Sequence, residues 1–402
     1  MVKKKNKKLS FGPGFLITAA FIGPGTITTC SMAGARFGYA LIYALLFATI
    51  TAIILQEMSG RLGLVSRFDL AQSLREFPKS KGVKIFYILL TFSSITFGCA
   101  VYEAGNIIGG SLGLEMVTSI PKNYWVIFIS LIAGLILSRG KYHWVEKFLI
   151  FLVFVMSISF LAAAIIVKPD FSNILKGLIP SFPPNSFYLI LALVGTTVVP
   201  YNLFLHSSVV KEKWKLPSDL SNLRKDLFLS VSLGGIISAS IIVTSAVAFY
   251  SQGIPLEKGA QLAEQLKPLF GSVTNILFGV GFFSAGMSSA LTAPYAASFA
   301  SAGVFGWDKG QKDIRFNLIW VGIILTGLIV SLLKISPLAV IVFAQAANGL
   351  ILPIASIFLL IILNNKKRMK KSANNLVQNM LGIFIITIVT FLGIWSIIRL
   401  FL

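Results

Sequence analysis

The amino-acid sequence predicts an all-α membrane protein with eleven transmembrane helices, and three observations lead to this fold class. The 402 residues are 56% hydrophobic and only 12% charged, with a mean hydropathy of +0.85, whereas soluble domains carry about 25% charged residues. The basic residues cluster between alternate apolar runs, and two of these runs are interrupted by proline at corresponding places. The runs are long and continuous, which excludes the short alternating strands of a membrane β-barrel.

Eleven apolar segments follow one another along the chain. Most approach or exceed the about 20 residues that a helix needs to cross the hydrocarbon of a bilayer. They cover residues 11–36, 38–60, 85–114, 124–138, 146–167, 185–210, 227–250, 269–302, 317–333, 338–363 and 376–400. The first run follows a lysine-rich stretch but has no small-residue cleavage pattern, so we expect a retained helix rather than a signal peptide.

The basic residues predict the orientation of these spans. With a cytoplasmic N-terminus and alternating spans, 27 of the 35 Lys and Arg residues fall in cytoplasmic segments. This bias matches the positive-inside rule. We therefore expect a multi-pass protein of the plasma membrane with a cytoplasmic basic N-terminus (1–10) and an extracellular C-terminus. The net charge of +21 then indicates topology and contact with anionic membrane lipids, not nucleic-acid binding.

The two interrupted spans predict an internal repeat. Gly23-Pro24-Gly25 breaks the first span, and Val199-Pro200-Tyr201-Asn202 breaks the sixth. Proline donates no amide hydrogen and frees carbonyls that lipid cannot satisfy. Paired breaks of this kind are typical of inverted-repeat transporters with a site near the midplane, although an ordinary proline kink is the alternative at each. We expect a first repeat over 11–168, a second over 185–363, and an eleventh helix within 376–402.

The sequence around both breaks resembles the Nramp family of divalent-metal transporters. The motifs that carry the resemblance are Gly12-Pro13-Gly14-Phe15-Leu16, Gly23-Pro24-Gly25-Thr26, Ala33-Gly34-Ala35-Arg36-Phe37-Gly38-Tyr39, Gln56-Glu57-Met58-Ser59-Gly60-Arg61-Leu62-Gly63 and the run from Ala192 to Ser208. Weaker similarity continues in Ala285 to Ser289 and in Gln345 to Pro353. The resemblance spans nearly the whole chain and implies the five-plus-five inverted-repeat architecture of LeuT-like transporters, with helices 1 and 6 broken.

The same resemblance shows that the family's metal-ligating side chains are largely replaced. The family motif Asp-Pro-Gly-Asn has Gly23 and Thr26 in place of its Asp and Asn. Val199 stands where the family has a methionine ligand, and Tyr201 stands where it has a histidine. Gln345 is retained, which leaves neutral groups at most of the expected substrate-binding positions.

Other candidate residues follow from the same breaks. The resemblance implies a backbone carbonyl ligand at Thr196, and Asn202 follows the second proline directly. The family's acidic pair in the third span, linked to proton passage, reads Glu103 and Asn106. A charged residue deep in a bilayer costs about 2.5–3.5 kcal/mol on insertion scales, so Glu103 is a functional candidate, with a helix-bracing role as the alternative. His206 is either a titrating group of the ion pathway or a core histidine.

The chemistry of these residues favours a particular class of substrate. Thr26 and freed carbonyls offer neutral oxygens, and Mg²⁺ dehydrates reluctantly, so we expect Mg²⁺ or Mn²⁺ to pass with water still bound, by alternating access with weak or no proton coupling. Thr26 and Glu103 are the expected metal-contacting residues. Two alternatives stay open: a solute such as an amino acid or anion held at the half-helix N-termini, and a membrane scaffold that transports nothing.

No catalytic constellation is found in the sequence. Ser207 and Ser208 follow His206 directly on one predicted helix, which does not position a nucleophile against a base. We therefore expect neither enzymatic activity nor a bound cofactor.

Overall fold

The computed structural model describes residues 12–14, 22–139, 143–310 and 312–401. The described chain is all-helical, and ten of its helical segments are long and apolar enough to cross a membrane. The predicted all-α membrane fold is thus confirmed. The first predicted span is described only in part, from Ile22 onward and at 12–14, so its first half lies outside the described residues.

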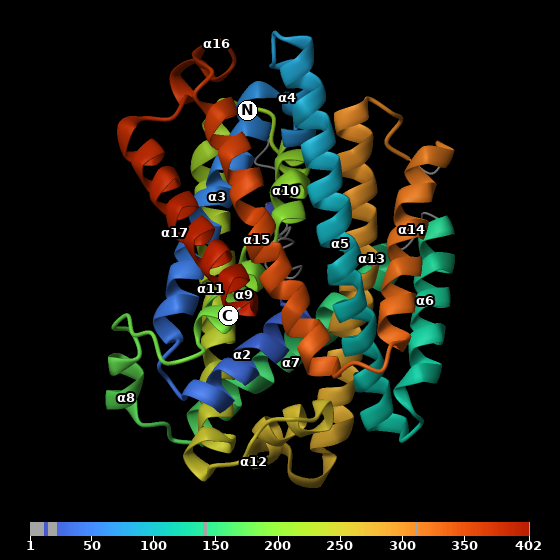
Figure 1. The fold of residues 1–402 in the computed structure, drawn as a ribbon, viewed down its shortest axis with the longest axis vertical. Helices are drawn as coiled ribbons and strands as arrows, with labels where there is room; N and C mark the ends of the chain where they lie inside the picture. Colours follow the sequence, from blue (N-terminus) through green and yellow to red (C-terminus); the bar gives the residue numbers. More distant parts are fainter. Residues whose placement is uncertain (1–11, 15–21, 140–142, 311, 402) are drawn as a thin grey trace, which may run out of the picture.

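The long helices form one bundle with roughly parallel and antiparallel axes (Figure 1). In chain order they are α3 (Ile42–Ser66), α5 (Lys81–Thr118), α6 (Lys122–Arg139), α7 (His143–Ile166), α11 (Leu220–Ala248), α13 (Thr274–Phe305), α14 (Ile314–Leu332), α15 (Pro337–Leu363) and α17 (Leu376–Phe401). Shorter helices cap the two ends. The α4 end carries α4 (Leu70–Glu76) and α16 (Lys366–Met369), and the α12 end carries α8 (Phe171–Lys176) and α12 (Lys267–Phe270).

Three half-length helices result from the prolines. α2 (Pro24–Phe37) begins at the first proline, α9 (Phe187–Thr197) ends just before the second, and α10 (Pro200–Lys213) begins at it. Proline is favoured at the first position of a helix because the missing amide would be unpaired there anyway. The break predicted in the sixth span is confirmed, and the helix after the first predicted break starts where expected.

Glycines let the central helices approach closely. A Cβ atom built at Gly113 of α5 would collide with the backbone of α13 at Gly279, and one built at Gly286 of α13 would collide with the backbone of α5 at Gly110. Small residues at such crossings replace the hydrophobic driving force that lipid does not provide. α5 has 38 residues and is about 57 Å long, so it is longer than the hydrocarbon of a bilayer is thick, about 30 Å.

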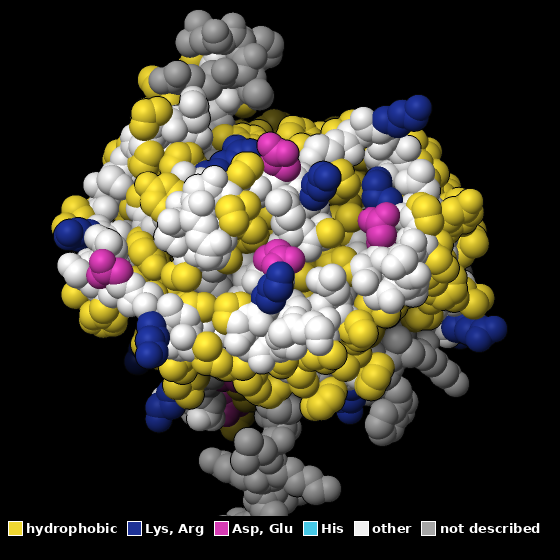
Figure 2. Space-filling view, turned by 90° about the horizontal axis from the view of Figure 1, so that it is seen from below, with side chains coloured by type: hydrophobic (Ala, Val, Ile, Leu, Met, Phe, Trp, Pro, Cys, Tyr) yellow, Lys and Arg dark blue, Asp and Glu magenta, His cyan; other side chains and the backbone are white. Residues whose placement is uncertain are grey.

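The surface fits a lipid environment. Many large apolar side chains on the outer helices are exposed, among them Phe86, Leu131, Phe151, Ile165, Leu229 and Ile329. At the α12 end, Lys and Arg side chains are scattered among Asp and Glu (Figure 2). The basic segment Lys366–Met369 and Lys211 at the end of α10 lie at the α4 end instead.

Candidate functional site

The two helix breaks lie side by side in the core. The hydroxyl oxygens of Thr26 on α2 and Thr196 on α9 are 2.8 Å apart, which is hydrogen-bonding distance, and both residues are fully buried. The N-terminal end of α2 therefore meets the C-terminal end of α9, where each helix leaves backbone groups without intrahelical partners. Two predicted site residues, 170 positions apart in the chain, are joined directly.

Gln345 of α15 completes one wall of this junction. A Cβ atom at Gly25 would overlap its side-chain amide, and a Cβ atom at Gly195 would overlap its backbone carbonyl. The Gln345 amide nitrogen lies 3.4 Å from the Ile341 carbonyl, while its oxygen Oε1 has no hydrogen-bond partner in the described part of the chain. The structure thus brings Thr26, Thr196 and Gln345 together, with a free acceptor oxygen.

The beginning of α10 supplies a second set of predicted residues. Val199 is the N-cap of α10 and fully buried, so its apolar side chain offers no ligand. Asn202 is 1% exposed, and neither its amide oxygen nor its amide nitrogen has a partner among the described residues. Buried amides without partners are costly, so Asn202 is poised for a ligand or water. His206, one turn further along, is buried against Gly60 of α3.

Glu103 points toward α14 and not toward the two helix breaks. Its carboxylate accepts a 3.2 Å hydrogen bond from the Asn106 amide, and its side chain packs on Gly327 of α14. The second carboxylate oxygen has no partner in the described chain. No three His, Cys, Asp or Glu residues group together in the described ranges in a way that could hold a metal ion. The expected contact of Glu103 with metal stays a prediction, as does its place on an ion pathway.

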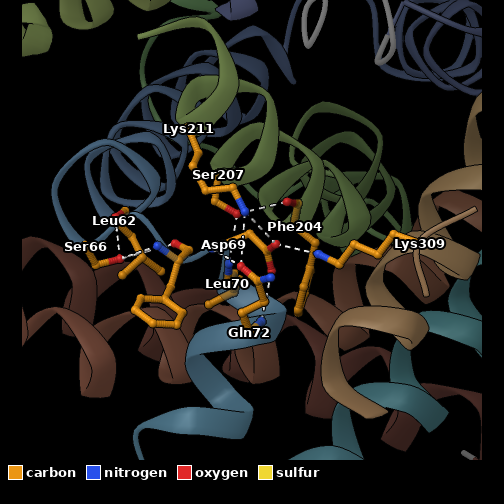
Figure 3. Close-up of polar contacts among 10 residues, drawn as sticks. Leu62, Ser66, Asp69, Leu70, Gln72, Phe204, Ser207, Lys211 and Lys309 are labelled. Atoms are coloured by element: carbon orange, nitrogen blue, oxygen red, sulfur yellow. Dashed lines mark hydrogen bonds and ion pairs between the residues drawn. The ribbon is translucent and has the colours of Figure 1, made fainter. Parts of the chain in front are cut away.

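A polar cluster around Asp69 joins several elements at the α4 end of the bundle (Figure 3). The Asp69 carboxylate, 1% exposed, lies 2.6 Å from the Lys309 ammonium and 3.4 Å from that of Lys211. The Leu70 amide donates a 2.9 Å hydrogen bond to the Ser207 hydroxyl of α10. Burial lowers the pKa of Lys309 from its usual value, and the Asp69 carboxylate opposes that shift. These bonds join α4, α10 and the segment between α13 and α14.

The opposite side of the site carries a cavity, which we call the vestibule. It has a volume of about 420 Å³ and is lined by Met32, Arg36, Leu189, Glu257 and Val342, with neighbouring apolar and hydroxyl side chains. Met32 lies about 9 Å beyond Thr26 along α2, and Val342 lies one turn from Gln345. The vestibule therefore adjoins the three helices that form the site, α2, α9 and α15.

Known proteins show the same overall arrangement. A profile of the family described as "Natural resistance-associated macrophage protein-like", Nramp, matches residues 14–399. The chain belongs to the Nramp family. Among curated Nramp relatives, "Divalent metal cation transporter MntH" of Caldanaerobacter subterraneus is 28% identical over 95% of this chain and 91% of its own. The MntH of Listeria welshimeri is 30% identical over 84% and 75% of the two chains.

Solved structures agree on the fold. A manganese transporter of Eremococcus coleocola, in complex with an aromatic bis-isothiourea substituted compound, superimposes with a TM-score of 0.78 at 22% identity, over 96% of this chain and 85% of that one. MhsT in complex with L-phenylalanine gives a TM-score of 0.65 at 15% identity, over 97% of this chain and 100% of that one. At these sequence identities, the likeness to the solved structures shows only that the Nramp protein described here has the same fold.

The structure adds three residues that sequence reasoning did not select. The Asn348 amide nitrogen, one turn after Gln345 on α15, is buried without a partner in the described chain. Tyr102 and Ser289 lie around Gly23. The three-residue spacing from Gln345 on one helix was a signal that could have indicated Asn348. Nothing in the sequence indicated which residues of α5 and α13 would face Gly23.

Proposed function

We propose that this Nramp protein transports divalent cations, Mg²⁺ and Mn²⁺, and that the ion passes the breaks with part of its water shell in place. The observation that carries this proposal is the set of neutral polar groups at the junction and at the start of α10. They are the hydroxyls of Thr26 and Thr196, the amide oxygen of Gln345 and the amide of Asn202, and the last two have no partner in the described chain. Such groups hydrogen-bond to metal-bound water, and Mg²⁺ keeps several waters when it binds proteins. The relatives named above, a divalent metal cation transporter and a manganese transporter, support the same substrate class.

Alternating access is the mode of transport that we propose. The Asp69 cluster links the elements at the α4 end, and the vestibule adjoins the site on the other side. The basic segments of the sequence favour a cytoplasmic α4 end in the plasma membrane, with the C-terminus outside. We propose weak or no proton coupling, because Glu103 hydrogen-bonds to a neutral amide, Asn106, where the family's motif has a second acid.

A second candidate function has one observation in its favour. Arg36 and Glu257 both line the vestibule, and a guanidinium beside a carboxylate is the charge pattern that suits a zwitterion such as an amino acid. A guanidinium at the entrance also repels cations. The organic-solute alternative is therefore kept, and the scaffold alternative receives no support from a specific contact.

Uptake into proteoliposomes tests the proposal. Purified protein is reconstituted, and the entry of Mg²⁺ or Mn²⁺ is followed with a trapped fluorescent indicator, under a potassium-diffusion potential of either sign. We expect potential-driven uptake that Thr26→Ala and Asn202→Ala reduce at least about fivefold, as for loss of one or two hydrogen bonds. Vesicles that admit no divalent ion but accumulate a radiolabelled amino acid would replace this proposal with the organic-solute alternative.

A further inference from the structure

Hydroxyl groups of two other helices, α13 and α5, lie against Gly23, and a third hydroxyl-bearing residue, on α10, packs beside the α5 residue. Gly23 stands where the Nramp motif has its aspartate, so this is the place that lost the family's carboxylate. A Cβ atom at Gly23 would lie 2.9 Å from the Ser289 hydroxyl of α13 and 3.7 Å from the Tyr102 hydroxyl of α5. Tyr201 of α10 stands beside Tyr102, with ring centroids 5.8 Å apart and the rings edge to face.

The two tyrosine hydroxyls are buried without a hydrogen bond of good geometry in the described chain. Tyr102 and Tyr201 are at most 2% exposed, and their hydroxyls lie close enough to interact with each other, but neither forms a hydrogen bond of good geometry with any described residue. Buried tyrosine hydroxyls ordinarily find partners, since leaving a polar group unpaired costs about 1–3 kcal/mol. Ser289 is 4% exposed and lies next to them. Polar groups left unpaired at one point of a transporter core indicate a place for a polar ligand.

We infer that Tyr102, Tyr201 and Ser289 form a hydroxyl subsite that binds the water shell of the transported cation. This inference rests on the proposed function and names the residues that decide its substrate class. Metal-bound water is a strong hydrogen-bond donor, and phenol and serine oxygens accept such bonds without contributing charge. The hydroxyl subsite therefore takes the place of the aspartate by binding the ion through water, and it favours ions that hold their waters tightly.

The location of the hydroxyl subsite suits this role. Gly23 is the N-cap of α2, and no side chain caps that helix end. Pro24 fills the next position and packs against Gly109 of α5, so α5 is held closely against the break. The Tyr102 hydroxyl consequently faces Gly23 from a rigid helix. Its neighbour Glu103 points to α14 instead, where its charge acts at a distance from the hydroxyl subsite.

The test uses an ion that cannot shed its ligands. Hexaamminecobalt(III) has the size and hydrogen-bonding shell of a hydrated magnesium ion but does not exchange its ammonia ligands. We expect it to inhibit Mg²⁺ uptake by the reconstituted full-length protein and to raise the melting temperature of the protein in detergent, because ligand binding stabilises the folded state. Tyr102→Phe and Ser289→Ala remove single hydroxyls and should each raise the KM for Mg²⁺ and the inhibitory concentration of hexaamminecobalt(III) about fivefold.

Two matched variants control for the loss of a hydroxyl elsewhere. Tyr43→Phe removes another tyrosine hydroxyl without a partner in the described chain, and Ser298→Ala does the same for a buried serine on α13. Both should behave as wild type.

If wild-type vesicles admit no divalent cation, both the proposed function and this inference are overturned. If they admit Mg²⁺ but hexaamminecobalt(III) neither inhibits nor stabilises, or the subsite variants match their controls, only the hydroxyl subsite is refuted. Should Tyr102→Phe fail to fold, Ser289→Ala alone decides.

Discussion

The hydrogen bond between Thr26 and Thr196 offers the sharpest test of the assembled site. Replacing either threonine by valine keeps the shape of the side chain and removes only the hydroxyl. Both residues are fully buried and their oxygens are 2.8 Å apart. Each single variant leaves the opposite hydroxyl without this partner, which costs about 1–3 kcal/mol.

The double variant separates this bond from other effects. When both hydroxyls are removed, neither is left unpaired by the loss of the other. The double variant should therefore be about 1 kcal/mol more stable than the sum of the stability losses of the two single variants predicts. Unfolding of the purified protein in detergent, followed by tryptophan fluorescence, measures this coupling. Mg²⁺ uptake should fall in all three variants, because transport needs the hydroxyls themselves.

Thr29→Val is the matched control for this cycle. Thr29 lies on the same helix, is fully buried, and its hydroxyl has no partner in the described chain. Its replacement should be neutral or slightly stabilising. Additive losses for Thr26 and Thr196, or a loss at Thr29 as large as that at Thr26, would contradict the direct bond between the two half-helices.

Three further predictions concern the vestibule, the α4 end and the helix junction. Arg36→Gln should raise cation uptake, and Arg36→Glu should raise it further, by a few-fold at low ionic strength and less at high salt. If flux assays show that both variants lower uptake, Arg36→Glu more strongly, the substrate is an anion. Asp69→Asn leaves Lys211 and Lys309 facing each other without a carboxylate, so the variant should lose about 2–4 kcal/mol of folding stability, measured as a lower melting temperature. The control is Glu264→Gln, in an exposed ion pair with Lys267, which should change stability by less than about 0.5 kcal/mol. Gly195→Ala places a methyl group against the Gln345 carbonyl and should abolish uptake or folding. The control Gly134→Ala adds a methyl group where no other atom lies within 4 Å, so it should be tolerated. Wild-type uptake in Gly195→Ala would contradict the close packing of α9 against α15.

Much of the architecture follows from local properties of the chain. Hydropathy places the spans because a bilayer demands about 20 apolar residues per helix, and observed helices such as α6 and α14 agree with the predicted segments to within a few residues. The break at Pro200 follows from the chemistry of proline, and α9 and α10 indeed stop and start around it.

The candidate site could be predicted only in part. Composition and spacing correctly place Glu103 deep in the bundle, where it is fully buried. They do not determine which way it points. One residue along an α-helix rotates a side chain by about 100°, so Tyr102 faces Gly23 while Glu103 faces Gly327.

The sequence by itself therefore determined the membrane class, the two breaks and the largely neutral chemistry at them, because each depends on residues that are neighbours in the chain. Only the tertiary structure decided the pairings: Thr26 with Thr196, the Asp69 carboxylate with Lys211 and Lys309, and the hydroxyl subsite around Gly23. The physical reason is that these contacts join residues far apart in sequence. Their formation depends on the rotation and close packing of whole helices, which no local pattern specifies.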